Sequence, residues 1–272
     1  MISDEKVKRD LPILREKLIE LRELAQSMPP RGFAYDESDH FGFMCLMYLA
    51  KQKEHASSVL CLIDDGHYRD AGLIARSMCE GLAQIKWAGL DAEIRPLRWR
   101  AFAYICDWRT MNAKLAEGTP VDPEDRETIQ KAIDQFGSLF LTKKAKDCQR
   151  RRKALPRDPF AKDWIQGRGY SAIFSEIKGD VLRKGIYAPF SSWHHWTCEE
   201  MASVITRGVD KITWLPPSDR EAARVLATTF QCLFEVTEVA DIYLNLGFST
   251  QLANVRDAFV SSLTVPIGEL HE

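Results

Sequence analysis

Two residues in the first third of this 272-residue chain, Arg76 and Glu80, could together form an anion site, with the arginine as the binding group and the glutamate as its orienting partner. They are spaced i, i+4, so they share one face if the segment is helical. The arginine fork fits a phosphate or carboxylate, and a neighbouring carboxylate can hold that fork in place. The same spacing is typical of a structural ion pair that fixes helix register. The sequence leaves both interpretations open.

The segment around this pair is apolar on nearly every side. Residues 71–88 include alanine, leucine, isoleucine, methionine and tryptophan at positions covering nearly the full circumference of a helix. A helix with this pattern is normally packed on several sides, so we expect it to be central. A buried charge is costly unless it is paired and hydrogen-bonded, which makes Arg76 and Glu80 candidate catalytic residues.

A second polar segment, residues 187–197, combines hydroxyl groups, aromatic rings and two adjacent histidines. Ser191 and His195 share a helix face, and imidazole exchanges protons readily near neutral pH. We therefore predict that Tyr187, Ser191 and His195 join Arg76 and Glu80 in one catalytic centre, and that His194 contacts substrate. The alternative is that the aromatic residues are core and His195 caps a polar cavity. Zinc-ligand spacing is lacking, so we expect neither metal nor cofactor.

Basic residues crowd a third segment, although the whole chain has a net charge of only −2. A phosphate backbone could bind there, and the predicted substrate-binding residues are Lys143, Lys144, Arg150, Arg151 and Arg152. The same run also includes Lys146, Lys153 and Arg157. The competing interpretation is a solvated helix end, where cations suit the negative pole of the helix dipole.

The segments that must position these residues have apolar residues spaced as in amphipathic helices. The predicted fold is therefore an all-α antiparallel bundle. Helices are expected at about 11–24, 40–62, 68–90, 95–116, 123–153, 190–204, 218–246 and 250–263, with irregular insertions around 157–185 and 205–217. An extended stretch is expected within 211–214. We predict an N-terminal amphipathic helix and linker over residues 1–38, followed by one bundle domain over residues 39–272.

Composition narrows the class of protein further. No stretch approaches the roughly 20 apolar residues that cross a bilayer, and no apolar secretory segment follows the charged N-terminus. The seven cysteines are scattered and lie mostly in helical apolar contexts, which favours reduced thiols. We therefore expect a cytoplasmic protein without a membrane partner.

Two passages together resemble an uncharacterised bacterial all-helical family classified only as a domain of unknown function. The first is Ala71-x-x-x-Ala75-Arg76-Ser77-x-x-Glu80, and the second is Tyr187-x-x-x-Ser191-Ser192-x-x-His195. In the family a glycine commonly follows this histidine, whereas Trp196 stands here. The family in turn looks distantly like HEPN proteins, many of which are metal-independent ribonucleases of toxin and phage-defence systems. Their arginine and histidine lie four to six residues apart on one helix, a spacing that this chain lacks.

The resemblance implies a HEPN-like protein that acts on RNA or a nucleotide, and it leaves a homodimer open. Arg76 would hold phosphate, and His195 would transfer protons. Two other classes of protein remain as alternatives. One is a non-catalytic binding or regulatory module, in which Arg76 and Glu80 are structural. The other is a metal-dependent oxidoreductase acting on a small molecule.

Overall fold

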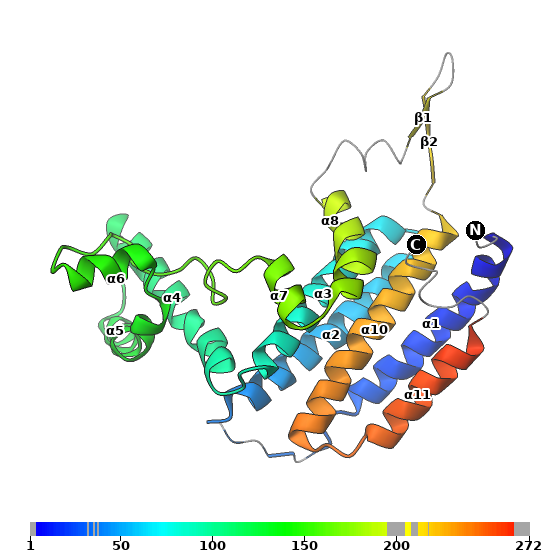
Figure 1. The fold of residues 1–272 in the computed structure, drawn as a ribbon, viewed down its shortest axis with the longest axis horizontal. Coiled ribbons are helices and arrows are strands. Elements are labelled where there is room, and N and C mark those ends of the chain that lie inside the picture. The colour runs from blue at the N-terminus through cyan, green and yellow to red at the C-terminus, as the bar shows by residue number, and fades with distance from the viewer. Residues whose placement is uncertain are drawn as a thin grey trace. The chain divides into compact units, whose positions relative to one another are not determined.

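The computed structural model describes residues 4–31, 33–34, 36, 38–194, 205–207, 212–216 and 218–263, which are mostly helical (Figure 1). The all-α prediction is confirmed. Two short strands, β1 (Ile205–Arg207) and β2 (Ile212–Trp214), pair antiparallel, and β2 covers residues 212–214 of the stretch expected to be extended, whose first residue, Lys211, lies outside the described residues. The chain forms two compact units: unit 1 comprises Met1–Trp87 and Tyr170–Glu272, and unit 2 comprises Ala88–Gly169.

Unit 1 is a bundle of long helices. They are α1 (Asp4–Gln26), α2 (His40–Asp64), α3 (Tyr68–Gly89), α10 (Asp219–Leu244) and α11 (Ser249–Ser262). Helix α10 packs against both α1 and α2, and α11 packs against α1 and α10 (Figure 1). A short turn at Gly66, whose φ is +78°, joins α2 to α3. These connections produce the antiparallel order expected from the sequence.

Helix α10 is central because side chains around most of its circumference are buried. It begins with the predicted capping box, in which Ser218 and Glu221 satisfy each other's free backbone amides. It ends at Asn245, which adopts the left-handed conformation common after a helix. One acidic residue of this helix, Asp241, is buried and accepts hydrogen bonds from the amide of Phe248 and the hydroxyl of Ser249. Asp241 therefore fixes the start of α11.

Three short elements complete the part of unit 1 that concerns the site. They are α7 (Tyr170–Glu176), the π-helical turn η2 (Leu182–Tyr187) and α8 (Ala188–His194). The indole of Trp87 on α3 donates a 2.7 Å hydrogen bond to Glu176 on α7. Gly72 on α3 lies directly under the ring of Phe190 on α8. Both contacts place these short elements against α3.

Unit 2 contains α4 (Ile94–Ala116), α5 (Pro123–Phe136), the 3-10 helix η1 (Gly137–Phe140) and α6 (Lys143–Arg150). Its core is formed by Ala101, Ile105, Phe140 and Phe160. The prediction of one continuous helix over 123–153 is wrong. The chain turns at Gly137 because Phe140 enters this core and Leu141 forms a β-bridge with Phe160.

None of the helices in the described residues combines the length and apolarity needed to span a membrane. Every cysteine in the same residues is a free thiol.

Candidate functional site

Helix α3 brings Arg76 and Glu80 into direct contact, as the i, i+4 spacing predicted. The Nη2 atom of Arg76 lies 2.8 Å from Oε1 of Glu80, and the two side chains are 14% and 23% exposed. The Nε atom of Arg76 is buried and has no hydrogen-bond acceptor among the described residues. A buried donor without an acceptor costs about 1–3 kcal/mol, and the described residues satisfy this guanidinium only in part.

Tyr187 meets Arg76 from a distant part of the chain. The guanidinium carbon of Arg76 lies 5.2 Å from the centroid of the Tyr187 ring, within the range of a cation–π interaction. Tyr187 is the last residue of the π-helical turn η2, and such turns occur frequently at functional sites. The structure therefore brings together three of the five predicted catalytic residues: Arg76, Glu80 and Tyr187.

A chain of hydrogen bonds extends this cluster in a direction that the sequence did not reveal. The amide of Gln84 donates to the hydroxyl of Tyr170, and Tyr48 donates to the carbonyl oxygen of Gln84, each over 2.5 Å. Burial and the nearby carboxylate of Glu80 raise the pKa of Tyr170 to about 12. Tyr170 is therefore a neutral hydroxyl at physiological pH and serves as donor or acceptor beside Glu80.

The aromatic rings around Arg76 form one wall of the cluster. Tyr170 and Tyr187 have their ring centroids 5.6 Å apart, and Phe174 lies 5.5 Å from Tyr187. Tyr170 lies in the region expected to be irregular, one residue after Gly169. Only the packing of α7 beside α3 assigns Tyr170 to the site, so no local sequence signal could have identified it.

Glycine allows the close approach that the cluster needs at Gly81. A Cβ atom there would lie 3.1 Å from the side-chain nitrogen of Gln52 and 3.7 Å from the ring of Tyr48. The buried side-chain amide of Gln52 also donates to the backbone carbonyl of Met78, about one turn before Gly81 on α3. Gly81 thus lets the side chains of Gln52 and Tyr48 on α2 pack closely against α3.

The structure describes the predicted serine and histidines only in part. Ser191 is half-buried on α8, one turn after Tyr187, and no hydrogen bond joins it to Arg76 or Glu80 among the described residues. His194 ends α8, but its side chain lies outside the described residues, as does all of His195. The predicted meeting of Arg76 with His195 therefore stays a prediction.

The predicted substrate-binding cations lie in unit 2, on α6 and the turn that follows it. Lys143, Lys144, Arg150, Arg151 and Arg152 are all exposed. Arg150 pairs with Asp147 at 2.9 Å on the same helix. A helix dipole explains Arg150 at the C-terminal end of α6 but not Lys143 and Lys144, which lie in the first turn. At that end a cation costs about 0.3–1 kcal/mol, so the helix dipole does not account for these two lysines, whereas their exposure to solvent is compatible with a solvated charge run.

Taken together, the fold and the polar cluster define an all-helical protein with an arginine–carboxylate–tyrosine centre inside its bundle. A family described only as a family of unknown function, DUF5677, matches residues 42–212, which include most of α2 together with α3, η2 and all of unit 2. The chain belongs to this family, which confirms the prediction of an uncharacterised family. No curated protein and no solved structure matches the chain.

Proposed function

We propose that this protein acts on RNA or a nucleotide, with Arg76 binding a phosphate group in the centre formed with Glu80 and Tyr187. The observation that carries the proposal is the buried Nε of Arg76, which finds no acceptor in the described chain. A phosphate oxygen would supply that acceptor and the charge that a guanidinium prefers. Glu80 and the ring of Tyr187 would hold the fork in one orientation.

The reaction that fits these residue types is RNA cleavage without a metal ion. The 2′-hydroxyl oxygen attacks the adjacent phosphorus, and the bond to the 5′ oxygen breaks. The products are a 2′,3′-cyclic phosphate and a free 5′-hydroxyl. One group must accept the 2′ proton and another must protonate the leaving oxygen, and we assign one of these transfers to His195. Arg76 would stabilise the negative charge that develops on the phosphate oxygens.

The charge distribution of the chain favours a phosphate-rich substrate. Basic residues outnumber acidic ones within Ala88–Gly169, whereas the rest of the chain is acidic. Exposed Lys143, Lys144, Arg151 and Arg152 would attract RNA through its backbone without reading its sequence. This attraction predicts binding that weakens steeply as salt concentration rises.

The test compares RNA cleavage by the wild type with cleavage by Arg76→Lys, Glu80→Gln and His195→Ala. Arg76→Lys keeps the charge and removes the fork, so we expect cleavage to fall at least about 100-fold. The matched control is Arg69→Lys, because Arg69 also lies on α3, is about as buried as Arg76, and pairs with Glu221 of α10 at 3.0 Å. Thermal unfolding reports whether each variant is folded. Equal cleavage by all folded variants, or no cleavage by the wild type, would remove the proposal.

A second candidate function is a non-catalytic binding module, and one observation favours it. Arg76 already has a carboxylate partner and an aromatic neighbour within the protein, as a structural ion pair would. In that case RNA binds with strong salt dependence but stays intact. Arg76→Lys would then lower the melting temperature more than Arg69→Lys and leave RNA affinity unchanged.

A further inference from the structure

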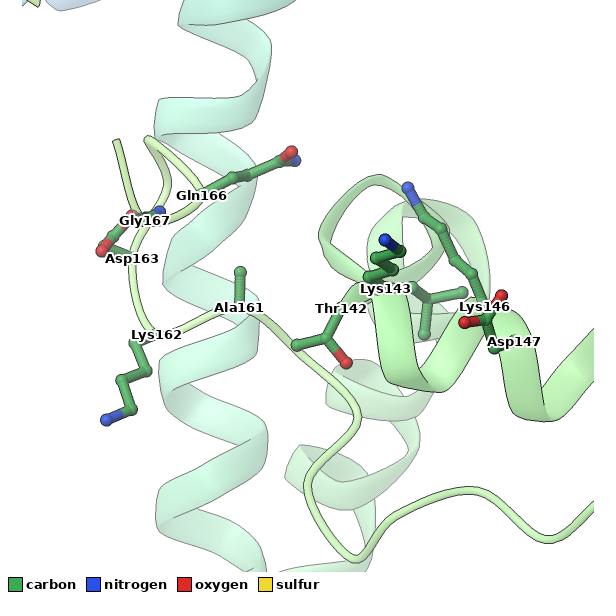
Figure 2. A pocket seen from close by; sticks show the side chains of 10 residues that line it. Thr142, Lys143, Lys146, Asp147, Ala161, Lys162, Asp163, Gln166 and Gly167 are labelled. Atoms are coloured by element: carbon green, nitrogen blue, oxygen red, sulfur yellow. Dashed lines mark hydrogen bonds between the residues drawn. The ribbon is translucent and has the colours of Figure 1, made fainter. Parts of the chain in front are cut away.

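Unit 2 contains a pocket that the proposed reaction centre does not use. It lies between the start of α6 and the loop over residues 161–167, and its volume is about 690 Å³ (Figure 2). Its polar lining comprises Thr142, Lys143, Lys146, Asp147, Lys162, Asp163 and Gln166. This volume falls within the usual range for small-molecule sites, about 300–1,000 Å³.

The positive charge of the pocket is not neutralised by its own carboxylates. Lys143 and Lys146 form no ion pair or hydrogen bond in the part of the chain that the structure describes. Asp147 is paired with Arg150, and the Oδ1 atom of Asp163 accepts the amide of Gly167. The two ammonium groups are therefore free to bind an anion.

The side chains differ in where they point (Figure 2). Lys143 and Lys146 extend to the same side of α6, and the amide end of Gln166 faces them across the pocket. Lys162 leaves the loop in another direction, away from that pair. Two of the three lining lysines can thus reach one bound group, and the third offers an internal control.

The walls of the pocket are fixed before any ligand arrives. Thr142 donates its backbone amide and its hydroxyl to the carbonyl of Pro159, over 2.9 and 3.1 Å. The amide of Ala161 donates to the carbonyl of Phe140 over 2.7 Å. The side chain of Gln166 donates to the carbonyl of Leu139 over 2.6 Å. Because these hydrogen bonds already hold the pocket walls in place, less conformational entropy is lost when a ligand binds.

We propose that this pocket binds the phosphate group of a nucleotide or of an RNA backbone, held by Lys143 and Lys146. Two neighbouring ammonium groups balance the charge of a phosphate better than that of a single carboxylate, and the remaining volume accommodates the attached sugar and base. The positions of Lys143 and Lys144 in the first turn of α6, unfavourable for an isolated helix, are then stabilised by the bound anion. The site does not depend on catalysis at Arg76.

The experiment measures binding of two probes by calorimetry at low salt. Adenosine 5′-monophosphate presents an isolated phosphate monoester, and an octanucleotide RNA with hydroxyl groups at both ends presents only backbone diesters. We expect at least one probe to bind the wild type about tenfold more tightly than it binds Lys143→Met/Lys146→Met. The control Lys162→Met, which removes a lysine from the same pocket, should stay within about twofold of the wild type.

The two probes separate the sources of the phosphate. Loss of adenosine monophosphate binding identifies a free nucleotide, whereas loss of octanucleotide binding alone identifies the RNA backbone. The proposal is overturned if neither probe distinguishes the double variant from the wild type. It is also overturned if Lys162→Met loses half or more of the binding free energy lost by the double variant, because general surface charge then explains the affinity. Neither result bears on RNA cleavage by the Arg76 centre, which is measured separately.

Discussion

Replacing Gly72 with alanine tests whether α8 lies against α3, on which the candidate site depends. A Cβ atom at Gly72 would lie 2.8 Å from both Cδ1 and Cε1 of Phe190, closer than carbon atoms normally approach. Overpacking of this kind costs about 1–3 kcal/mol. Alanine in place of glycine otherwise stabilises a helix interior by about 1 kcal/mol. We therefore expect Gly72→Ala to lower the free energy of unfolding by about 1 kcal/mol.

The sign of this effect should reverse when the ring is removed. Phe190→Ala alone costs about 3 kcal/mol, because a large and mostly buried side chain is lost. In that background Gly72→Ala meets no ring, so only its helix propensity remains, and it should stabilise the protein by about 1 kcal/mol. The two residues would then be coupled by about 2 kcal/mol, well above the additivity expected for distant sites.

The assay is urea unfolding followed by circular dichroism, applied to the wild type, the two single variants and the double variant. Phe190→Ala also serves as the reference for loss of packing without overpacking. If Gly72→Ala stabilises the protein in both backgrounds, Phe190 does not cover Gly72. The placement of α8, and with it the meeting of Tyr187 and Arg76, would then be refuted.

Three further predictions concern other residues of the described chain. Thr228→Val should raise the free energy of unfolding by about 1 kcal/mol, because the buried hydroxyl of Thr228 has no hydrogen-bond partner among the described residues. Thr229→Val should lower it, because the hydroxyl of Thr229 donates to the carbonyl of Val225. Urea unfolding measures both changes, and equal effects of the two substitutions would contradict the assignment. The pKa of Tyr170 is about 12 in the folded state against an ordinary 10.0, so its contribution to stability is present below pH 10 and is lost as the pH rises toward 12. Between pH 10 and 12 the melting temperature of the wild type should therefore fall more steeply than that of Tyr170→Phe. Parallel curves of melting temperature against pH would exclude the raised pKa. Arg152 has a φ of +52°, which glycine adopts more readily, so Arg152→Gly should raise the melting temperature. The same substitution removes a cation and should lower the salt dependence of RNA binding. A lower melting temperature would show that the arginine side chain stabilises the turn.

The helices of unit 1 and part of the candidate site could be predicted from the sequence because local signals specify them. The apolar circumference of residues 71–88 identified α3 as central, and the i, i+4 spacing placed Glu80 beside Arg76. The capping box at Ser218 fixed the start of α10 within one residue. Each of these features depends on neighbours within one or two helical turns, which the sequence displays directly.

Contacts between distant segments could not be predicted in the same way. Residues 123–153 look helical throughout, and the break at Gly137 follows only from the contact between Phe140 and Phe160 in the core. Because this break was not predicted, the position of Lys143 at the start of a separate helix was not predicted either. Tyr170 reaches Glu80 through a packing arrangement that no periodicity encodes.

Because the chain is synthesised from its N-terminus, the division into two units affects how it folds. Unit 1 is discontinuous, since α10 follows the whole of unit 2 in the sequence. Ribosomes add about 5–20 residues per second, so α1–α3 wait roughly 8–30 s for the helix that covers their apolar faces. Unit 2 is continuous and is complete before α10 emerges. The nascent N-terminal helices are thus exposed to chaperones or to mispairing for that interval, during which unit 2 can already have formed its own core.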